Sequence, residues 1–190
     1  MRFLNIISDL INSTSNEDCK CLDNAFLIGL FQTPPPIARH IVFAPLSSEK
    51  KQQLVESYAL HFPADLLLLY GKINGANLFW TTIYNDYLKR SFPLCHFSIY
   101  GYPETTRKRI EPYNISIEDL AHPEGTPDHW LKFGSYISPV APLSERYLYI
   151  DTQSSEIFAL TGDKTIHIAQ SWETLDSCLC DIYSQLESAC

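Results

Sequence analysis

The chain has 190 residues, of which 45% are hydrophobic and 19% are charged, and its formal net charge is −8 at pH 7. This length and apolar content suffice for one folded domain with a buried core, and they exclude the composition of a disordered chain. Charged and polar residues interrupt the apolar runs well before the roughly 18 residues that a membrane helix needs, so the sequence predicts a soluble protein without membrane contact.

The charge is unevenly distributed along the chain. Residues 1–110 carry 11 basic and 9 acidic side chains, whereas residues 111–190 carry 3 basic and 13 acidic ones. An acidic surface repels nucleic acid and anionic lipid and attracts basic partners. Solubility alone is the other explanation of this acidity, and the sequence leaves both open.

The six cysteines could suggest a disulfide framework. Such frameworks belong mainly to small secreted domains that lack a sufficient core, and this chain is longer and rich in apolar residues. The N-terminal stretch Met1–Asp9 is interrupted by Asn5 and is poor material for a signal peptide. The sequence therefore predicts a cytoplasmic protein with free thiols.

Helices and extended segments alternate in the first third of the chain. Apolar residues at helical spacing predict a first helix over Arg2–Ile11. An apolar stretch of uncertain structure, Ala25–Phe31, precedes three prolines, Pro34–Pro36, which force an extended connection before a short strand at 41–43. A second helix then begins at Ser47 or Ser48, either of which can cap it.

A third helix is expected to begin at Pro63, because proline suits the first helical position and Asp65 favours the positive end of the helix dipole. Leucines, Tyr70 and Ile73 form its apolar face. Asn74-Gly75 supplies a left-handed stop. The chain pattern then changes from helical to alternating.

Short β-rich runs separated by turn residues follow. They are Leu78–Ile83, Cys95–Tyr100, Tyr147–Ile150, Glu156–Leu160 and Thr165–Ala169. The last three are joined by the turns 151–155 and 161–164, which predict two hairpins. A final helix is expected to open at Ser171 with Glu173 in its first turn. The whole predicts an α+β fold with an antiparallel or mixed sheet flanked by helices, in a single domain over residues 1–190.

No pattern in the sequence indicates catalysis or metal binding. Cys19-Lys20-Cys21 and Cys178-Leu179-Cys180 have one intervening residue, whereas structural zinc sites usually have two to four. Cys95 and His96 are strand neighbours that point to opposite faces. The basic run Arg107-Lys108-Arg109 is too short for a nucleic-acid site. We predict no catalytic residue, cofactor, metal or nucleic-acid partner and expect that the protein is not an enzyme; an unrecognised hydrolase is one alternative.

Several short motifs follow one another between residues 60 and 186. The run Leu66-Leu67-Leu68-Leu69-Tyr70-Gly71-Lys72-Ile73-Asn74-Gly75-Ala76 is followed by Ile99-Tyr100-Gly101, Trp130-Leu131-Lys132-Phe133-Gly134-Ser135, Tyr149-Ile150-Asp151-Thr152 and Ser171-Trp172-Glu173-Thr174-Leu175. In this order they resemble the SUKH superfamily, the Smi/Knr group: its tyrosine and Asn-Gly signature, its strands, its phenylalanine-glycine turn and its closing helix. The resemblance leaves residues 1–59, a helical and proline-rich part, unplaced, and leaves open whether 76–98 is an insertion.

The resemblance implies a non-enzymatic protein-binding domain, in bacteria commonly an immunity protein that neutralises a cognate polymorphic toxin, often a nuclease. A nuclease surface is basic because it holds phosphates, and an acidic protein complements it. A cytoplasmic adaptor or regulatory scaffold of the same fold is the alternative. The candidate partner-binding residues are the acidic Glu118, Asp119, Glu124, Asp128, Asp151 and Glu156, with Tyr136 as an aromatic anchor.

Overall fold

The computed structural model describes residues 1–13, 19–22, 24–30, 38–57, 62–85, 87, 89–102, 125–139, 144–161 and 167–189. Its elements are α1 (Arg2–Ser13), β1 (Cys19–Leu22), β2 (Ala25–Leu30), β3 (Ala38–Phe43), α2 (Ser48–Ser57), α3 (Ala64–Tyr70), β4 (Ala76–Asn85), β5 (Arg90–Ile99), β6 (Trp130–Ile137), β7 (Glu145–Asp151), β8 (Ile157–Thr161), β9 (Ile168–Trp172) and α4 (Leu175–Ala189).

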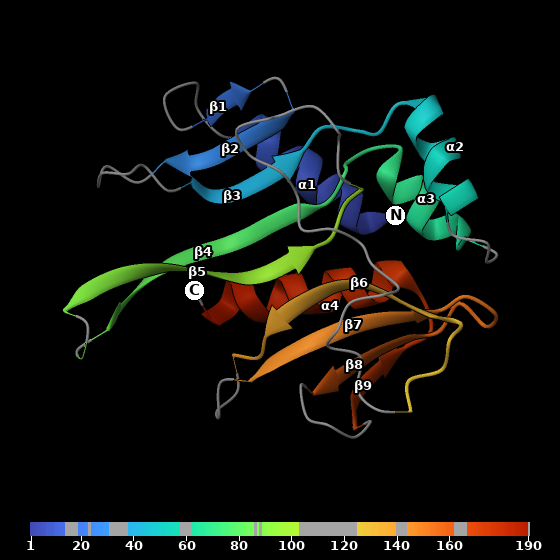
Figure 1. The fold of residues 1–190 in the computed structure, drawn as a ribbon. Coiled ribbons are helices and arrows are strands. Elements are labelled where there is room, and N and C mark those ends of the chain that lie inside the picture. Colours follow the sequence, from blue (N-terminus) through green and yellow to red (C-terminus); the bar gives the residue numbers. More distant parts are fainter. Residues whose placement is uncertain are drawn as a thin grey trace.

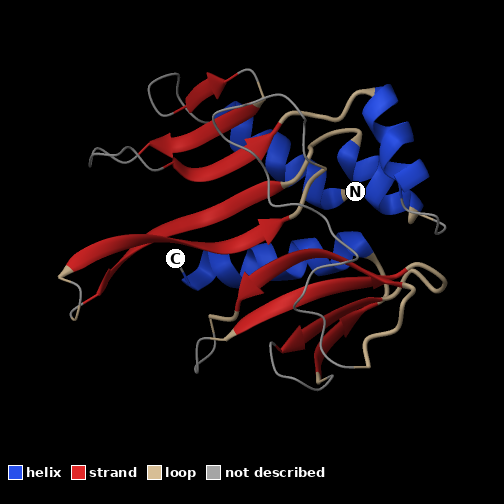
Figure 2. Cartoon of the chain, viewed as in Figure 1, coloured by secondary structure: helices blue, strands red, loops and turns tan. Residues whose placement is uncertain are grey.

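These strands form a nine-stranded sheet in which the spatial order β1 to β9 is the chain order. Each strand pairs antiparallel with the next (Figures 1 and 2). The α+β class is therefore confirmed, and the sheet is antiparallel throughout its described pairs rather than mixed. No helix within the described ranges combines the length and apolar content needed to cross a membrane.

The main core lies between the sheet and helices α1 and α4. Phe3 of α1 packs against Phe97 of β5 and Tyr183 of α4, with ring centroids 6.4 and 6.3 Å apart. Helix α4 buries one face through residues at helical spacing, namely Leu175, Cys178, Leu179, Ile182, Tyr183 and Leu186. Burial of these side chains supplies the driving force that holds the two helices on the sheet.

Helix α1 receives its N-terminal cap from a residue far away in the chain. The carboxylate of Asp176 accepts hydrogen bonds from the backbone N–H groups of Arg2 and Phe3, both at 2.9 Å. A carboxylate at this position satisfies two free donors and complements the helix dipole. Asp176 also lies in the first turn of α4, so one charge serves the N-termini of both helices.

Replacement of this shared cap should destabilise the fold. Asp176→Ala is expected to lower the free energy of unfolding by about 2 kcal/mol, since it removes a cap and a favourable dipole interaction. Urea unfolding measures the change. Glu187→Ala, which removes an exposed carboxylate near the other end of α4, is the matched control. Equal losses in the two variants would contradict the capping role.

Asn74 and the two glycines Gly75 and Gly101 form a close backbone contact between the segments that follow α3 and β5. The Asn74 side chain donates to the carbonyl of Tyr102 and accepts from the N–H of Tyr102, both at 2.8 Å. Gly75 has φ +87°, the left-handed conformation expected of the stop. We call Asn74, Gly75 and Gly101 the asparagine lock.

Helix α3 nevertheless ends at Tyr70, three residues before the predicted Ile73. The backbone N–H of Asn74 donates to the carbonyl of Phe43 at 3.1 Å, so the chain leaves the helix to join β3. The Tyr70 hydroxyl donates to the carbonyl of Tyr100 at 2.9 Å and ties the end of α3 to the same segment. Tertiary pairing thus shortens the helix that local propensity favours.

Residues 76–98 belong to the central hairpin of the sheet. β4 and β5 pair from Ala76 with Ile99 to Asn85 with Arg90. In contrast, β3 pairs only with the first two residues of β4, and β6 pairs with β5 only at Phe97–Ile99. The far half of the hairpin therefore projects beyond its neighbours (Figure 1). The interval 76–98 is thus paired along its length and connects the two halves of the sheet.

Two expectations for the ends of the chain need correction. The N-terminal part predicted as helical and proline-rich contributes three strands, β1 to β3, to the sheet, of which only the short strand at 41–43, within β3, was predicted. At the other end the described strand is Ile168–Trp172, and Thr165 and Ile166 of the predicted strand Thr165–Ala169 lie outside the described residues. Helix α4 begins at Leu175 rather than at Ser171. Ser171 and Trp172 pair with β8, and the cap is Thr174, whose Oγ1 accepts from the N–H of Ser177 at 3.1 Å.

Candidate protein-binding surface

The structure gathers three of the predicted acidic residues at one end of strands β6, β7 and β8. Trp130 pairs with Asp151, which places Asp128 beside the end of β7, and the N–H of Asp151 donates to the carbonyl of Glu156 at 2.9 Å. Glu173 follows Trp172, which pairs with Ile157, so it lies opposite Glu156. Neighbouring strands lie about 4.8 Å apart, so these carboxylates share one surface. We call Asp128, Asp151, Glu156 and Glu173 the acidic edge.

Asp151 has a structural role within this edge. Its Oδ1 accepts hydrogen bonds from the N–H groups of Gln153 and Ser154, at 2.7 and 3.2 Å, and its Oδ2 lies 3.6 Å from Nε2 of His129. Burial alone would raise the pKa of Asp151, but these backbone donors and His129 lower it, and the net shift is downward. The carboxylate is charged at neutral pH and holds the β7–β8 turn.

The other three carboxylates are not used by the described fold. Asp128, Glu156 and Glu173 are all exposed, and no hydrogen bond or ion pair joins their carboxylates to another described residue. Their charges can therefore be neutralised by a partner without loss of a contact among the described residues. Sequence reasoning missed Glu173 because it assigned this residue to the first turn of the last helix.

The remaining candidates do not join the acidic edge. Glu118, Asp119 and Glu124 lie outside the described residues. Tyr136 is only 2% exposed and belongs to the main core. Its hydroxyl accepts from Nη1 of Arg146 at 3.1 Å and donates to Oε1 of Gln170 at 3.4 Å. A side chain held in this way cannot serve as a surface anchor, which corrects the expectation for Tyr136.

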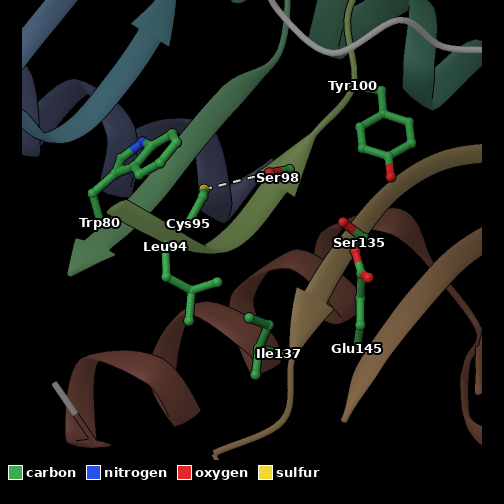
Figure 3. A pocket seen from close by; sticks show the side chains of 8 residues that line it. All are labelled: Trp80, Leu94, Cys95, Ser98, Tyr100, Ser135, Ile137 and Glu145. Carbon is green, nitrogen blue, oxygen red and sulfur yellow. Dashed lines mark hydrogen bonds between the residues drawn. The ribbon is translucent and has the colours of Figure 1, made fainter. Parts of the chain in front are cut away.

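A cleft of about 480 Å³ opens where β5 and β6 diverge beyond the pair Phe97–Tyr136 (Figure 3). Residues from β4 to β7 and the segment after β5 line it: Trp80, Leu94, Cys95, Ser98, Tyr100, Ser135, Ile137 and Glu145. We call it the β5–β6 cleft. It combines aromatic and aliphatic walls with hydroxyl groups and one carboxylate.

The thiol in this cleft is poorly suited to nucleophilic chemistry. Burial raises the pKa of Cys95 to about 11, although contacts with Ser98 and with the carbonyls of Phe97 and Leu78 oppose the rise. The thiol is therefore protonated at neutral pH, and only a thiolate is a good nucleophile. His96 contacts the Thr81 hydroxyl at 2.7 Å, and no hydrogen bond or ion pair joins its ring to the Cys95 thiol. The described residues also contain no group of three potential metal ligands.

Comparison with models of protein families, with curated proteins and with solved structures found no match to this chain.

Proposed function

We propose that this chain is a non-enzymatic, cytoplasmic protein-binding domain that acts as an immunity protein, with the acidic edge as the surface that meets a basic partner. A toxin domain with nuclease activity has the required chemistry, because its substrate site is lined with cations that hold phosphates. The motif resemblance to the SUKH superfamily and the charge of the edge support the proposal independently.

One observation carries the proposal: Asp128, Glu156 and Glu173 project three exposed carboxylates that the described fold does not use. They lie in the half of the chain, residues 111–190, that has 13 acidic and 3 basic side chains. Clustered charge of this kind accelerates association with an oppositely charged protein and makes it sensitive to salt. A purely solubilising charge needs no such grouping.

Neutralising the edge should weaken partner binding while leaving the fold intact. In a pull-down from cells of the source organism at low salt, the wild-type protein is expected to retain one basic protein at one-to-one stoichiometry, identified by mass spectrometry. The combined variant Asp128→Asn, Glu156→Gln and Glu173→Gln is expected to bind that protein at least about tenfold more weakly, because the charge attraction is lost.

The matched control is Asp9→Asn with Glu49→Gln and Glu187→Gln, which removes three exposed carboxylates on α1, α2 and α4 and changes the net charge equally. This control should bind as the wild-type protein does. If both triple variants bind the partner equally weakly, net charge rather than the acidic edge decides the interaction. If no basic protein is retained, the adaptor or scaffold function becomes the better explanation.

A further inference from the structure

The β5–β6 cleft lies at the other end of β7 from Asp151 of the acidic edge. Glu145 begins β7 and Asp151 ends it, and the two share a strand face because their spacing is even. A strand of this length spans about 20 Å. One partner surface of ordinary size can therefore cover both the acidic edge and the cleft.

The polar corner of the cleft is built around the Glu145 carboxylate. This side chain is exposed, and its Oε2 accepts a hydrogen bond from the Tyr147 hydroxyl at 3.1 Å. That bond fixes the carboxylate without neutralising its charge. In Figure 3 the carboxylate of Glu145 and the hydroxyl of Tyr100 both turn toward Ser135. The corner thus offers an anionic acceptor flanked by two hydroxyl groups that also accept hydrogen bonds.

The opposite wall of the cleft is apolar. The indole of Trp80 and the aliphatic side chains of Leu94 and Ile137 line it (Figure 3). Lysine and arginine side chains combine an apolar stem with a cationic head, and their stems pack on such surfaces. Their heads are attracted to aromatic rings, most strongly to tryptophan. The two walls of the cleft therefore match the two parts of a basic side chain.

We infer that the β5–β6 cleft receives a lysine or arginine side chain of the partner, whose cation pairs with Glu145 while its stem lies along Trp80. This inference rests on the proposed function, since it names a second contact for the same basic partner. The chain's net charge of −8 favours a cation in the cleft.

Lys132 works against a second cation near this site. It is 2% exposed, does not line the cleft, and holds its Nζ 4.0 Å from the ring centroid of Tyr147 and 5.8 Å from that of Tyr100. An isolated lysine or arginine side chain should therefore bind weakly in the cleft, with a dissociation constant of about 1 mM or higher. Within a complex the same contact adds to the interactions at the acidic edge.

The test uses the full chain and Nα-acetyl-arginine N-methylamide, with the corresponding citrulline compound as a neutral probe of the same shape. Two-dimensional ¹H–¹⁵N NMR reports on the indole N–H of Trp80, assigned through the Trp80→Phe variant. The arginine probe is expected to shift this signal saturably and the citrulline probe is not. Glu145→Gln should weaken binding about tenfold through loss of the charged acceptor, and Glu187→Gln should leave it unchanged.

Equal shifts with the two probes, no saturable shift with arginine, or unchanged binding in Glu145→Gln would each overturn the inference. The outcome is separable from that of the proposed function. If the arginine probe does not bind in the cleft but a basic partner is captured through the acidic edge, the proposed function stands. Arginine binding that depends on Glu145, without any basic partner, supports the cleft and overturns the proposed function alone.

Discussion

Gly101→Ala is expected to lower the free energy of unfolding by about 3 kcal/mol or more, because the new methyl group has no room in the asparagine lock. An ideal Cβ at Gly101 would lie 2.2 Å from the carbonyl oxygen of Asn74 and 2.8 Å from its Oδ1. Both atoms are fixed, the first as backbone and the second by its hydrogen bond from Tyr102. Relief of the clash requires β5 to move away from the end of α3.

Urea or guanidinium unfolding measures this loss, and Gly71→Ala provides the matched control. Gly71 has φ −72° and ψ −9°, and a Cβ there would meet its nearest neighbours at 3.4 Å. Alanine at Gly71 should change the free energy of unfolding by less than about 1 kcal/mol, with stabilisation favoured by the loss of unfolded-state entropy. A similar small effect at Gly101 would show that the asparagine lock is not a rigid contact.

Acidification from pH 7 to about pH 4 is expected to cost about 3 kcal/mol of stability through His40 alone. This side chain is 4% exposed, its Nδ1 accepts the backbone N–H of Phe79 at 3.3 Å, and its ring packs edge-on against that of Phe79 at 5.0 Å. Burial, with a smaller contribution from the charge of Arg39, lowers the pKa of His40 from 6.5 to about 4.

The direction follows from the two protonation states. Between about pH 6.5 and pH 4 the unfolded chain binds a proton at His40 and the folded chain does not, so stability is complete above this window and falls through it. Protonation would also remove the acceptor of the Phe79 N–H. Phe79 has φ +57°, a conformation that a phenylalanine adopts only when its surroundings hold it there.

Denaturant unfolding at several pH values tests this expectation. His40→Gln keeps an acceptor oxygen but does not titrate, so its stability should decline with acid by about 3 kcal/mol less than that of the wild-type protein. His167→Gln removes an exposed histidine and should leave the acid dependence unchanged. If all three proteins lose stability equally, His40 is not the group responsible.

Much of the fold is predictable from local pattern. The alternating runs at Leu78–Ile83 and Tyr147–Ile150 lie in β4 and β7, and the helical periodicity at Arg2–Ile11 lies in α1. β1 was not predicted, because its four residues show no alternation of burial and depend on pairing with β2. The start of α4 was misplaced because Ser171 and Glu173 form a plausible cap pattern, whereas β8 holds Ser171 in the sheet.

The candidate site was less predictable, because strand register decides which side chains share a surface. Composition alone directed attention to the acidic residues, but only the pairing of β6, β7 and β8 brings Asp128, Asp151 and Glu156 together. The prediction that Tyr136 is a surface anchor was wrong for a related reason. The register of β6 shifts between Lys132 and Gly134, and this irregularity places both Phe133 and Tyr136 in the core, although their odd spacing puts them on opposite faces of a regular strand.

The order of folding events is constrained by the short β3–β4 and β5–β6 junctions. Most neighbouring strands are separated by short connections, whereas residues 44–75 separate β3 from β4 and residues 100–129 separate β5 from β6. β3 and β4 pair only through two residues of each strand, and β5 pairs with β6 only through Phe97–Ile99. Closing these two long connections costs the most entropy and forms the fewest strand pairs. The strands on either side of each junction can therefore pair early and independently, and the docking of α4 beside α1 then brings the parts of the sheet together as the cooperative late step.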